Sequence, residues 1–376
     1  MSGLSCRHTA GVLQSWATPR AIPPAISSHG WRVVDLHHVN RVLIVRLGAL
    51  GDIVHAIPVA AALRRAFPDA QIDWLVSTKH REILDLVPVI DRRLAIDDRA
   101  GAGAVTRMLA GIREVRRARY DVALDLQGLL KSAVLARSAG ARRVIGFSSR
   151  YVREPLARAF YTEAHDPIGV AHIVRQNLAL LERIGLTVIA PEFPIEQVDS
   201  AVARQVRERA GGCYALLNPG AAWPNKRWPP SRFAAVAASL ASRHGVASVV
   251  LWGPGEQSLA EEVVAASGGA AMLSPPTSIA DVVALARAAA LMVSGDTGPT
   301  HVAAAVGTPI VGLYGPTHPS RNGPWSSHDV TVSRDAICQC HHLRRCRLER
   351  MCLLDIEVDE VLSAVERRLA SERSRV

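Results

Sequence analysis

The sequence predicts an α/β protein with two parallel sheets in succession, and three observations lead to this prediction. Short apolar runs alternate with stretches of helical periodicity over most of the chain, which is typical of strand-helix-strand units. A Pro-punctuated segment, VIAPEFP at 188–194, interrupts the series and divides it into two halves. The chain has 376 residues, 49% of them hydrophobic, and exceeds the commonest size of a single domain. We therefore expect two Rossmann-like domains.

The first half begins with RVLIV at 41–45, an apolar run typical of a buried parallel strand. A glycine-containing turn, LGALGD, leads into an apolar-faced helix expected from Ile53 to about Ala66. Residues 41–195 are assigned to an N-terminal domain, and residues 1–40, with scattered Pro, Ser and His, to a poorly ordered extension. Further short strands, separated by helices, are expected at 72–76, 94–96, 122–126 and 143–147.

The second half repeats this pattern from YALLN at 214–218, and a final helix is expected from about Val358 to Glu372. Residues 205–352 are assigned to a C-terminal domain and residues 353–376 to a C-terminal helical segment. Further strands of this half are expected at 248–252, near 271–273, up to Ser294 and at 309–314.

Four turns follow strands of the second half: NPG at 218, WGPG at 252, GDTG at 295 and YGPT at 314. The carboxyl ends of parallel strands share one edge of a sheet, and ligands bind beyond that edge. The four turns should therefore line one ligand-binding rim.

The turn SGDTGPTH at 294–301 has the features of an anion site. It follows an apolar strand and precedes a helix of small residues, so free N–H groups and the positive end of the helix dipole favour phosphate there. Asp296 and Thr297 are suitable caps, Gly298 lets a ligand approach the backbone, and Pro299 suits a first-turn position. An ordinary capped helix is the alternative for this turn taken alone. The similar strand, glycine turn and helix after residue 45 favours a ligand site.

The charge balance favours anionic partners. The chain has 44 Lys and Arg against 34 Asp and Glu, a net charge of +10, and Arg strongly outnumbers Lys. Arg suits planar anions such as phosphate and carboxylate, so anionic substrates or an anionic membrane surface are expected. Only 5% of residues are aromatic and no nucleic-acid-binding motif occurs, so nucleic acid is not expected. No apolar run reaches the roughly 20 residues that span a bilayer, and the first 40 residues do not resemble a secretory signal.

Seven motifs occur in one order along the chain: RLGALGDIVHAIP from 46, YDVALDLQGLLKS from 120, REPLARAFY from 153, NKRWP from 225, WGPGE from 252, GDTGPTH from 295 and YGPT from 314. With these motifs the chain resembles glycosyltransferase family 9, the ADP-heptose:lipopolysaccharide heptosyltransferases, and is most similar to the heptosyltransferase I branch. The resemblance implies a GT-B fold, two Rossmann-like domains facing across a central cleft, and an inverting mechanism without a metal or other cofactor. It also implies ADP-heptose as donor, a lipid-linked acidic inner-core acceptor (Kdo-lipid A or a heptosyl acceptor), and a cytoplasmic location peripheral to the inner membrane.

Two residues are expected to carry the chemistry. Inverting transfer needs one base on the acceptor hydroxyl and a positive group at the departing diphosphate. The resemblance places the family's catalytic Asp at Asp52 and its phosphate-binding lysine at Lys226. The structural alternatives are an N-cap for a helix starting at Ile53 and an ordinary exposed surface lysine.

The remaining candidates divide between the two substrates. Thr297 and Gly298 are expected nearest the diphosphate, with Asp296 toward the sugar, and His301 either near the mouth or bracing the helix. The resemblance adds Asn225, within the NKRWP block, and Glu256, which matches a position that contacts the nucleoside through ribose hydroxyls. The acceptor face is expected to include six polar or basic residues: Asp125, Gln127, Lys131, Arg142, Arg143 and Arg153. Surface solvation explains a lone Arg equally well.

The tail CQCHHLRRCRLERMC places Cys338, Cys340, Cys346 and Cys352 at ligand-like density, which fits a structural metal, redox pairing or plain reduced thiols. Such tails also occur in the heptosyltransferase II-like branch. The turn after residue 45, with Asp73 following, permits a nicotinamide-dinucleotide site, but it lacks the G-x-G pair. The residues also leave room for a different nucleotide sugar, for a protein acceptor, and for a protein that binds a nucleotide sugar without catalysis.

Overall fold

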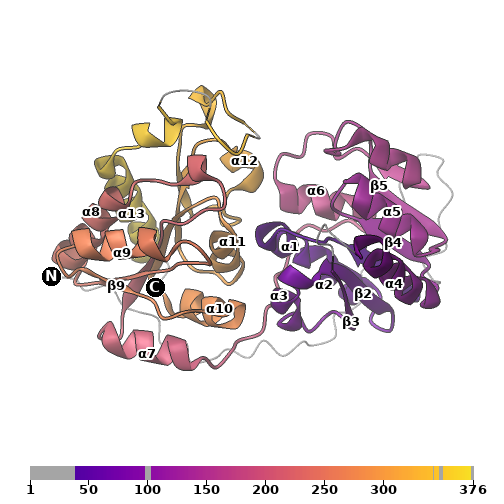
Figure 1. The fold of residues 1–376 in the computed structure, drawn as a ribbon, viewed down its shortest axis with the longest axis horizontal. Coiled ribbons are helices and arrows are strands. Elements are labelled where there is room, and N and C mark those ends of the chain that lie inside the picture. Colours follow the sequence, from indigo (N-terminus) through magenta and orange to yellow (C-terminus); the bar gives the residue numbers. More distant parts are fainter. Residues whose placement is uncertain (1–38, 98–102, 342, 347–349, 374–376) are drawn as a thin grey trace. The chain divides into compact units, whose positions relative to one another are not determined.

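The computed structural model describes residues 39–97, 103–341, 343–346 and 350–373. Almost all of the expected N-terminal extension lies outside these residues. The chain forms two compact units, with the boundary between residues 194 and 195. Each unit contains a six-stranded sheet in which every strand pair is parallel, with helices packed around it (Figure 1). The predicted two-domain α/β architecture is thus confirmed.

The sheet of the N-terminal unit has the order β3-β2-β1-β4-β5-β6. Its topological switch point lies between β1 and β4, the strands from which the chain order runs in opposite directions. Every β1 residue after the first is fully buried, as expected for a strand covered on both faces. The strands are β1 (Arg41–Val45), β2 (Gln71–Ser77), β3 (Arg92–Ile96), β4 (Val122–Asp125), β5 (Arg143–Phe147) and β6 (Glu163–His165).

One helix of this unit differs from its prediction. The expected helix from Ile53 to Ala66 is divided in two, and its first part begins at Leu50. Pro58 causes the break, because it lacks an N–H and its ring clashes with the preceding turn of a continuous helix; it occupies the first turn of α2 instead. The helices are α1 (Leu50–Val54), α2 (Ile57–Ala66), α3 (Glu82–Asp85), α4 (Ala104–Arg117), α5 (Leu130–Ser138) and α6 (Ile173–Ala179), with 3₁₀ turns η2 (Thr78–His80), η3 (Pro155–Phe160) and η4 (Leu180–Ile184).

The sheet of the C-terminal unit has the order β12-β11-β10-β7-β8-β9, the same topology read from the other side. Its switch point lies between β7 and β10. The expected strands are present, and the sheet also has an edge strand, β12, that the sequence pattern did not predict. The strands are β7 (Tyr214–Asn218), β8 (Ala247–Val250), β9 (Ala271–Leu273), β10 (Leu291–Gly295), β11 (Ile310–Tyr314) and β12 (Val330–Ser333).

Successive side chains of β7 enter two different cores. Ala215 and Leu217 join a cluster with α8, α9 and α13, whereas Tyr214 and Leu216 join one with α7, α10 and α11. The sheet is therefore a middle layer between two helical layers. The helices are α7 (Ala201–Arg209), α8 (Pro230–His244), α9 (Gln257–Ala266), α10 (Ile279–Ala288), α11 (Gly298–Ala305), α12 (Pro319–Asn322) and α13 (Val358–Arg373), with 3₁₀ turns η5 (Pro224–Lys226), η6 (Asp335–Ile337) and η7 (Cys352–Asp355). None of the described helices is both long and apolar enough to cross a membrane.

Candidate active site

In the N-terminal unit, the loops after β1 and β4 are joined at the switch point. The side-chain oxygen of Gln127 accepts a hydrogen bond of 2.7 Å from the backbone N–H of Leu47. Arg46 follows β1, is 8% exposed, and donates to the backbone carbonyl of Leu126. Its other terminal nitrogen lies 2.8 Å from the carboxylate of Asp52. The buried guanidinium of Arg46 thus contacts both loops and holds Asp52 at the rim of this sheet.

Asp52 is the third residue of α1, and its side chain is 41% exposed. Its carboxylate accepts a hydrogen bond of 3.2 Å from the backbone N–H of Ala49, the residue at the N-cap position. The alternative of an N-cap for a helix starting at Ile53 is therefore wrong, because the helix starts earlier and Asp52 reaches back from its first turn. The carboxylate of Asp52 is thus anchored at the start of α1 and partly exposed.

Asp125 is a correction to the expected acceptor face. Its side chain has no exposed surface, and it accepts hydrogen bonds from the hydroxyls of Ser132 (2.9 Å) and Tyr161 (2.7 Å) and from the N–H of Gln127 (2.9 Å). Burial raises the pKa of this carboxyl, against the lowering effect of the hydrogen bonds from Tyr161 and Ser132. A residue so enclosed cannot contact an acceptor, so its role is to hold the loop after β4.

Arg142 and Arg143 also lie away from the expected site. Arg143 is the first residue of β5, and its guanidinium donates to both carboxylate oxygens of Glu163, at 2.6 and 2.8 Å. This hydrogen bond lowers the pKa of Glu163, with burial opposing it. Because ligands bind beyond the carboxyl ends of parallel strands, a position at the amino end of β5 is at the opposite edge. Gln127, Lys131 in the first turn of α5, and the exposed Arg153 remain as acceptor candidates at the rim.

The acidic residue that a dinucleotide site would require, Asp73, is not accessible to a ligand. Asp73 is the third residue of β2 and is fully buried, and its carboxylate accepts a hydrogen bond of 2.6 Å from the hydroxyl of Tyr120. It therefore stands within the sheet and is not accessible to a ribose.

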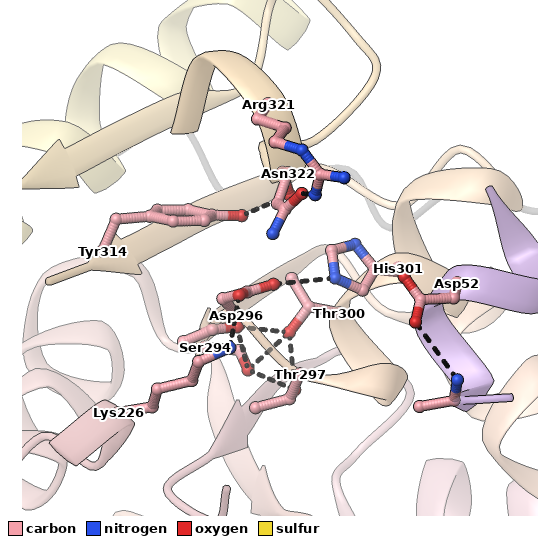
Figure 2. A network of polar contacts seen from close by, with 12 residues as sticks. Asp52, Lys226, Ser294, Asp296, Thr297, Thr300, His301, Tyr314, Arg321 and Asn322 are labelled. Atoms are coloured by element: carbon pink, nitrogen blue, oxygen red, sulfur yellow. Dashed lines mark hydrogen bonds and ion pairs between the residues drawn. The ribbon is translucent and has the colours of Figure 1, made fainter. Parts of the chain in front are cut away.

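In the C-terminal unit, a buried network fixes the GDTG turn: the hydroxyls of Ser294, Thr297 and Thr300 (Figure 2) together with the amide of Asn218. Asn218, the last residue of β7, donates to the hydroxyls of Ser294 (3.1 Å) and Thr297 (2.9 Å). The Thr300 hydroxyl lies 2.7 Å from both the hydroxyl of Ser294 and the carbonyl oxygen of Gly295, so it can donate to the carbonyl and accept from Ser294. Thr297 is the N-cap residue of α11, as expected, but its hydroxyl belongs to this network. The N–H groups of the first turn of α11 have no partner within the helix, as at any helix N-terminus, and an anion site uses such groups.

Asp296 lies between two cationic or potentially cationic groups (Figure 2). Its carboxylate oxygens are 2.6 Å from Nζ of Lys226 and 2.9 Å from Nε2 of His301. Burial alone would raise the pKa of Asp296, but the hydrogen bond and charge of His301 and the ammonium of Lys226 hold it well below its usual value. The side chain of Lys226 is 16% exposed and its Nζ lies 4.8 Å from the ring centre of Trp223, so it is not an ordinary surface lysine.

Glu256 and Gly220 form a close pair between the loops after β8 and β7. The Glu256 carboxylate accepts a hydrogen bond of 3.1 Å from the N–H of Gly253. A Cβ atom added at Gly220 would overlap this carboxylate. Glycine at position 220 is thus what allows Glu256 to occupy the rim.

The side chain of Asn225 is buried and bonded to the tail segment. It is 3% exposed, and its side-chain amide donates to the backbone carbonyl of Leu343 at 2.9 Å. This burial leaves little of the side chain exposed to a donor, and the predicted donor contact stays a prediction. The hydrogen bond to Leu343 attaches the Lys226 segment to the cysteine-rich tail.

The tail cysteines pack together as thiols. Sγ of Cys340 lies 3.1 Å from Sγ of Cys346, and the N–H of Cys340 donates to Sγ of Cys338 at 3.4 Å. Burial and the neighbouring Cys338 raise the pKa of Cys352 to about 12, so its thiol stays protonated at neutral pH. Within the ranges that the structure describes, no three His, Cys, Asp or Glu side chains are arranged to hold a metal ion. The cluster packs against the loop after β11, where a Cβ at Gly315 would lie 3.1 Å from Cys352.

Sequence reasoning missed three contributors to this arrangement: Arg46, Asn218 and Gly220. Each lies within a motif that the sequence analysis identified, namely the RLGALGD and NPG turns. Their partners are Asp52, the turn after β10 and Glu256. The signal was present, but the pairing across distant loops was not visible in a linear pattern.

Comparisons with known proteins agree with the fold. The family model for glycosyltransferase family 9 (heptosyltransferase) matches residues 108–352. The lipopolysaccharide heptosyltransferase 1 of Pseudomonas aeruginosa is 31% identical over 312 residues, which are 79% of this chain and 85% of that protein. A family 9 glycosyltransferase structure from Veillonella parvula aligns with a TM-score of 0.74 at 23% identity, covering 90% of this chain and 99% of that one. An E. coli heptosyltransferase structure with ADP-2-deoxy-2-fluoro heptose aligns with a TM-score of 0.67 at 25% identity, covering 87% and 99%.

Proposed function

The chain belongs to glycosyltransferase family 9, the heptosyltransferases, and from this we propose that it transfers a heptosyl unit from ADP-heptose to a sugar hydroxyl of the lipopolysaccharide inner core. The observation that carries the proposal is the Lys226–Asp296 pair beside the N-terminus of α11. It places a positioned ammonium next to backbone donors, a combination suited to a diphosphate leaving group. The heptosyltransferase 1 relative and the structure with an ADP-heptose analogue support this choice of substrates.

At the donor end, each residue has a distinct task. The Lys226 ammonium and the N–H groups of the first turn of α11 neutralise the developing charge on the ADP diphosphate. Asp296 keeps the ammonium in place, and His301 holds Asp296 from the other side. Glu256 accepts hydrogen bonds from the ribose hydroxyls.

At the acceptor end, Asp52 removes the proton from the attacking hydroxyl. The oxygen then forms a bond to the anomeric carbon as the bond from that carbon to the diphosphate breaks, which inverts the configuration. ADP leaves with the electron pair, and no metal or cofactor takes part. Gln127, Lys131 and Arg153 contact the acidic sugars. Because this acceptor is attached to a lipid, the enzyme works at the cytoplasmic face of the inner membrane as a peripheral protein.

Nucleotide selectivity tests the donor assignment. In calorimetric titrations of the purified protein with ADP, UDP, GDP and NAD in the presence of a chelator, we expect ADP to bind most tightly. A preference for UDP or GDP would support another nucleotide sugar, and a preference for NAD would overturn the glycosyltransferase site. Transfer is then measured with ADP-heptose and a delipidated inner-core acceptor.

Gly220→Ala should weaken ADP binding with little effect on stability. The added methyl would displace the Glu256 carboxylate, and the free end of a Glu side chain moves at small cost. We expect the Kd for ADP to rise by about tenfold, the effect of one lost hydrogen bond to a charged group. Glu256→Ala should give the same loss, and the double variant should add nothing to it. Additive losses would contradict a common path through Glu256.

A further inference from the structure

Exposed apolar side chains gather at the start of α5 in the N-terminal unit. Among the described residues, Leu130, Tyr151 and Leu156 are exposed to 38%, 39% and 72%. Leu130 is the first residue of α5, and the other two belong to the segment that leads into and begins η3. Large apolar side chains that gather at a surface are typical of a site of interaction.

Two backbone contacts join these segments into one surface. The N–H of Leu130 donates to the carboxylate of Glu154 at 2.7 Å, and the N–H of Glu154 donates to the carbonyl of Gly128 at 3.4 Å. A Cβ at Gly128 would lie only 2.9 Å from Cγ1 of Val152. Residues 151–156 therefore pack directly against residues 128–130.

Basic residues accompany the apolar ones. Arg150 and Arg153 are exposed, and Lys131 is half-buried next to Leu130. The one acidic side chain in the segment, Glu154, has its carboxylate engaged by the N–H of Leu130. We define the α5–η3 patch as Leu130, Lys131, Arg150, Tyr151, Arg153 and Leu156.

This composition matches one kind of partner, an anionic phospholipid surface. Apolar side chains gain free energy by entering the region between headgroups and acyl chains, and cations gain free energy near anionic headgroups. An acidic protein partner would also bury Leu156, which is 72% exposed, and vesicles that contain no other protein separate the two kinds of partner.

The patch also lies at the functional edge of its unit. Helix α5 starts beyond the carboxyl end of β4, and the loop between them is attached to the loop after β1 through Gln127 and Leu47. That second loop leads into α1, which carries Asp52. A surface bound at the patch would therefore be close to the rim that meets the acceptor.

We propose that the α5–η3 patch docks the enzyme on an anionic phospholipid bilayer, with Leu156 and Tyr151 inserted and Arg150 on the headgroups. Lys131 and Arg153, which are assigned above to the acceptor, add to the positive charge of the same surface. A role of this docking in catalysis rests on the proposed function, because only an enzyme with a lipid-linked acceptor needs to lie on the bilayer. The docking itself requires neither nucleotide nor acceptor.

Vesicle sedimentation tests the proposal with the full-length protein. Vesicles of phosphatidylglycerol and phosphatidylethanolamine should bind it, phosphatidylcholine vesicles should bind it weakly, and salt should reduce the binding. Leu156→Asp should lower the affinity for anionic vesicles by about tenfold or more, because a charge is placed where an apolar group inserts. Arg150→Glu should lower it by a similar factor.

Ile189→Asp is the matched control. Ile189 is 83% exposed in the same unit and lies outside the patch, so its substitution should leave vesicle binding unchanged. Equal losses in Leu156→Asp and Ile189→Asp, or no binding of the wild type, would overturn the proposal. Thermal unfolding and ADP affinity should be the same in both variants as in the wild type. The vesicles contain neither donor nor acceptor, so the docking proposal and the proposed function are tested separately. Vesicle binding can fail while ADP binding and heptosyl transfer succeed, and vesicle binding can succeed while these fail.

Discussion

Asp52→Asn is expected to lower the turnover number of heptosyl transfer by about 10²- to 10⁴-fold, the usual contribution of a general base. The amide keeps the shape of the carboxylate and an oxygen that can accept from Ala49, but it cannot take a proton from an acceptor hydroxyl. The affinity for ADP should change little, because the residues proposed for the donor belong to the other unit. Single-turnover transfer and ADP titration measure the two quantities separately.

Asp91→Asn is a closely matched control for this experiment. Asp91 pairs with Arg64 at 2.6 Å, accepts from the N–H of Ile72, and has a side-chain exposure of 43%, against 41% for Asp52. It precedes β3 and so stands at the amino edge of the sheet. Both variants should lose a similar amount of stability, and only Asp52→Asn should lose turnover. A loss of ADP binding in Asp52→Asn would instead assign Asp52 a structural role.

Strand-turn-helix patterns were sufficient to predict the architecture and the rim of each sheet. The reason is that parallel strands covered on both faces are continuous apolar runs, and the turns after them carry glycine and small polar residues. The short edge strands β6 and β12, with the sequences EAH and VTVS, lack such a run and depend on their neighbours for pairing. The break of the first helix at Pro58 escapes a prediction from apolar periodicity, because the periodicity continues through the proline.

The errors in the site have a different origin. The guanidinium of Arg143 suits an anionic acceptor, although its place at the start of an expected strand already puts it at the amino edge of a parallel sheet. Asp125 follows an apolar run like a rim residue, and besides the N–H groups of the next loop the hydroxyls of Ser132 and the distant Tyr161 enclose it. Its burial depends on contacts between segments that no local pattern contains.

The second large effect is expected at Lys226. Lys226→Met keeps most of the aliphatic stem and removes the ammonium that we assign to the ADP diphosphate. The Kd for ADP should rise by about 10- to 100-fold, as for the loss of a charged hydrogen bond, and transfer should fall at least as much. Lys226→Arg keeps the charge and should retain part of the affinity.

The substitution also affects Asp296. Its folded-state pKa is depressed below the unfolded value of about 3.9, so the contacts with His301 and Lys226 stabilise the fold above that value and are lost only as the pH falls toward the folded-state pKa. Removing the ammonium takes away one source of the depression and leaves His301 as the partner. Lys226→Met should therefore unfold at a higher pH on acid titration than the wild type.

A control must separate this stability effect from the loss of ligand binding. Arg368→Met also removes the cation from a buried carboxylate, because Arg368 is 3% exposed and lies 2.8 Å from Asp329, just before β12 at the edge away from the rim. Both variants should melt at lower temperature, but only Lys226→Met should bind ADP more weakly. If Arg368→Met weakened ADP binding equally, the effect at Lys226 would be general loosening of the unit. Unchanged ADP affinity in Lys226→Met would remove the lysine from the donor site and leave the N–H groups of α11 as the diphosphate-binding element.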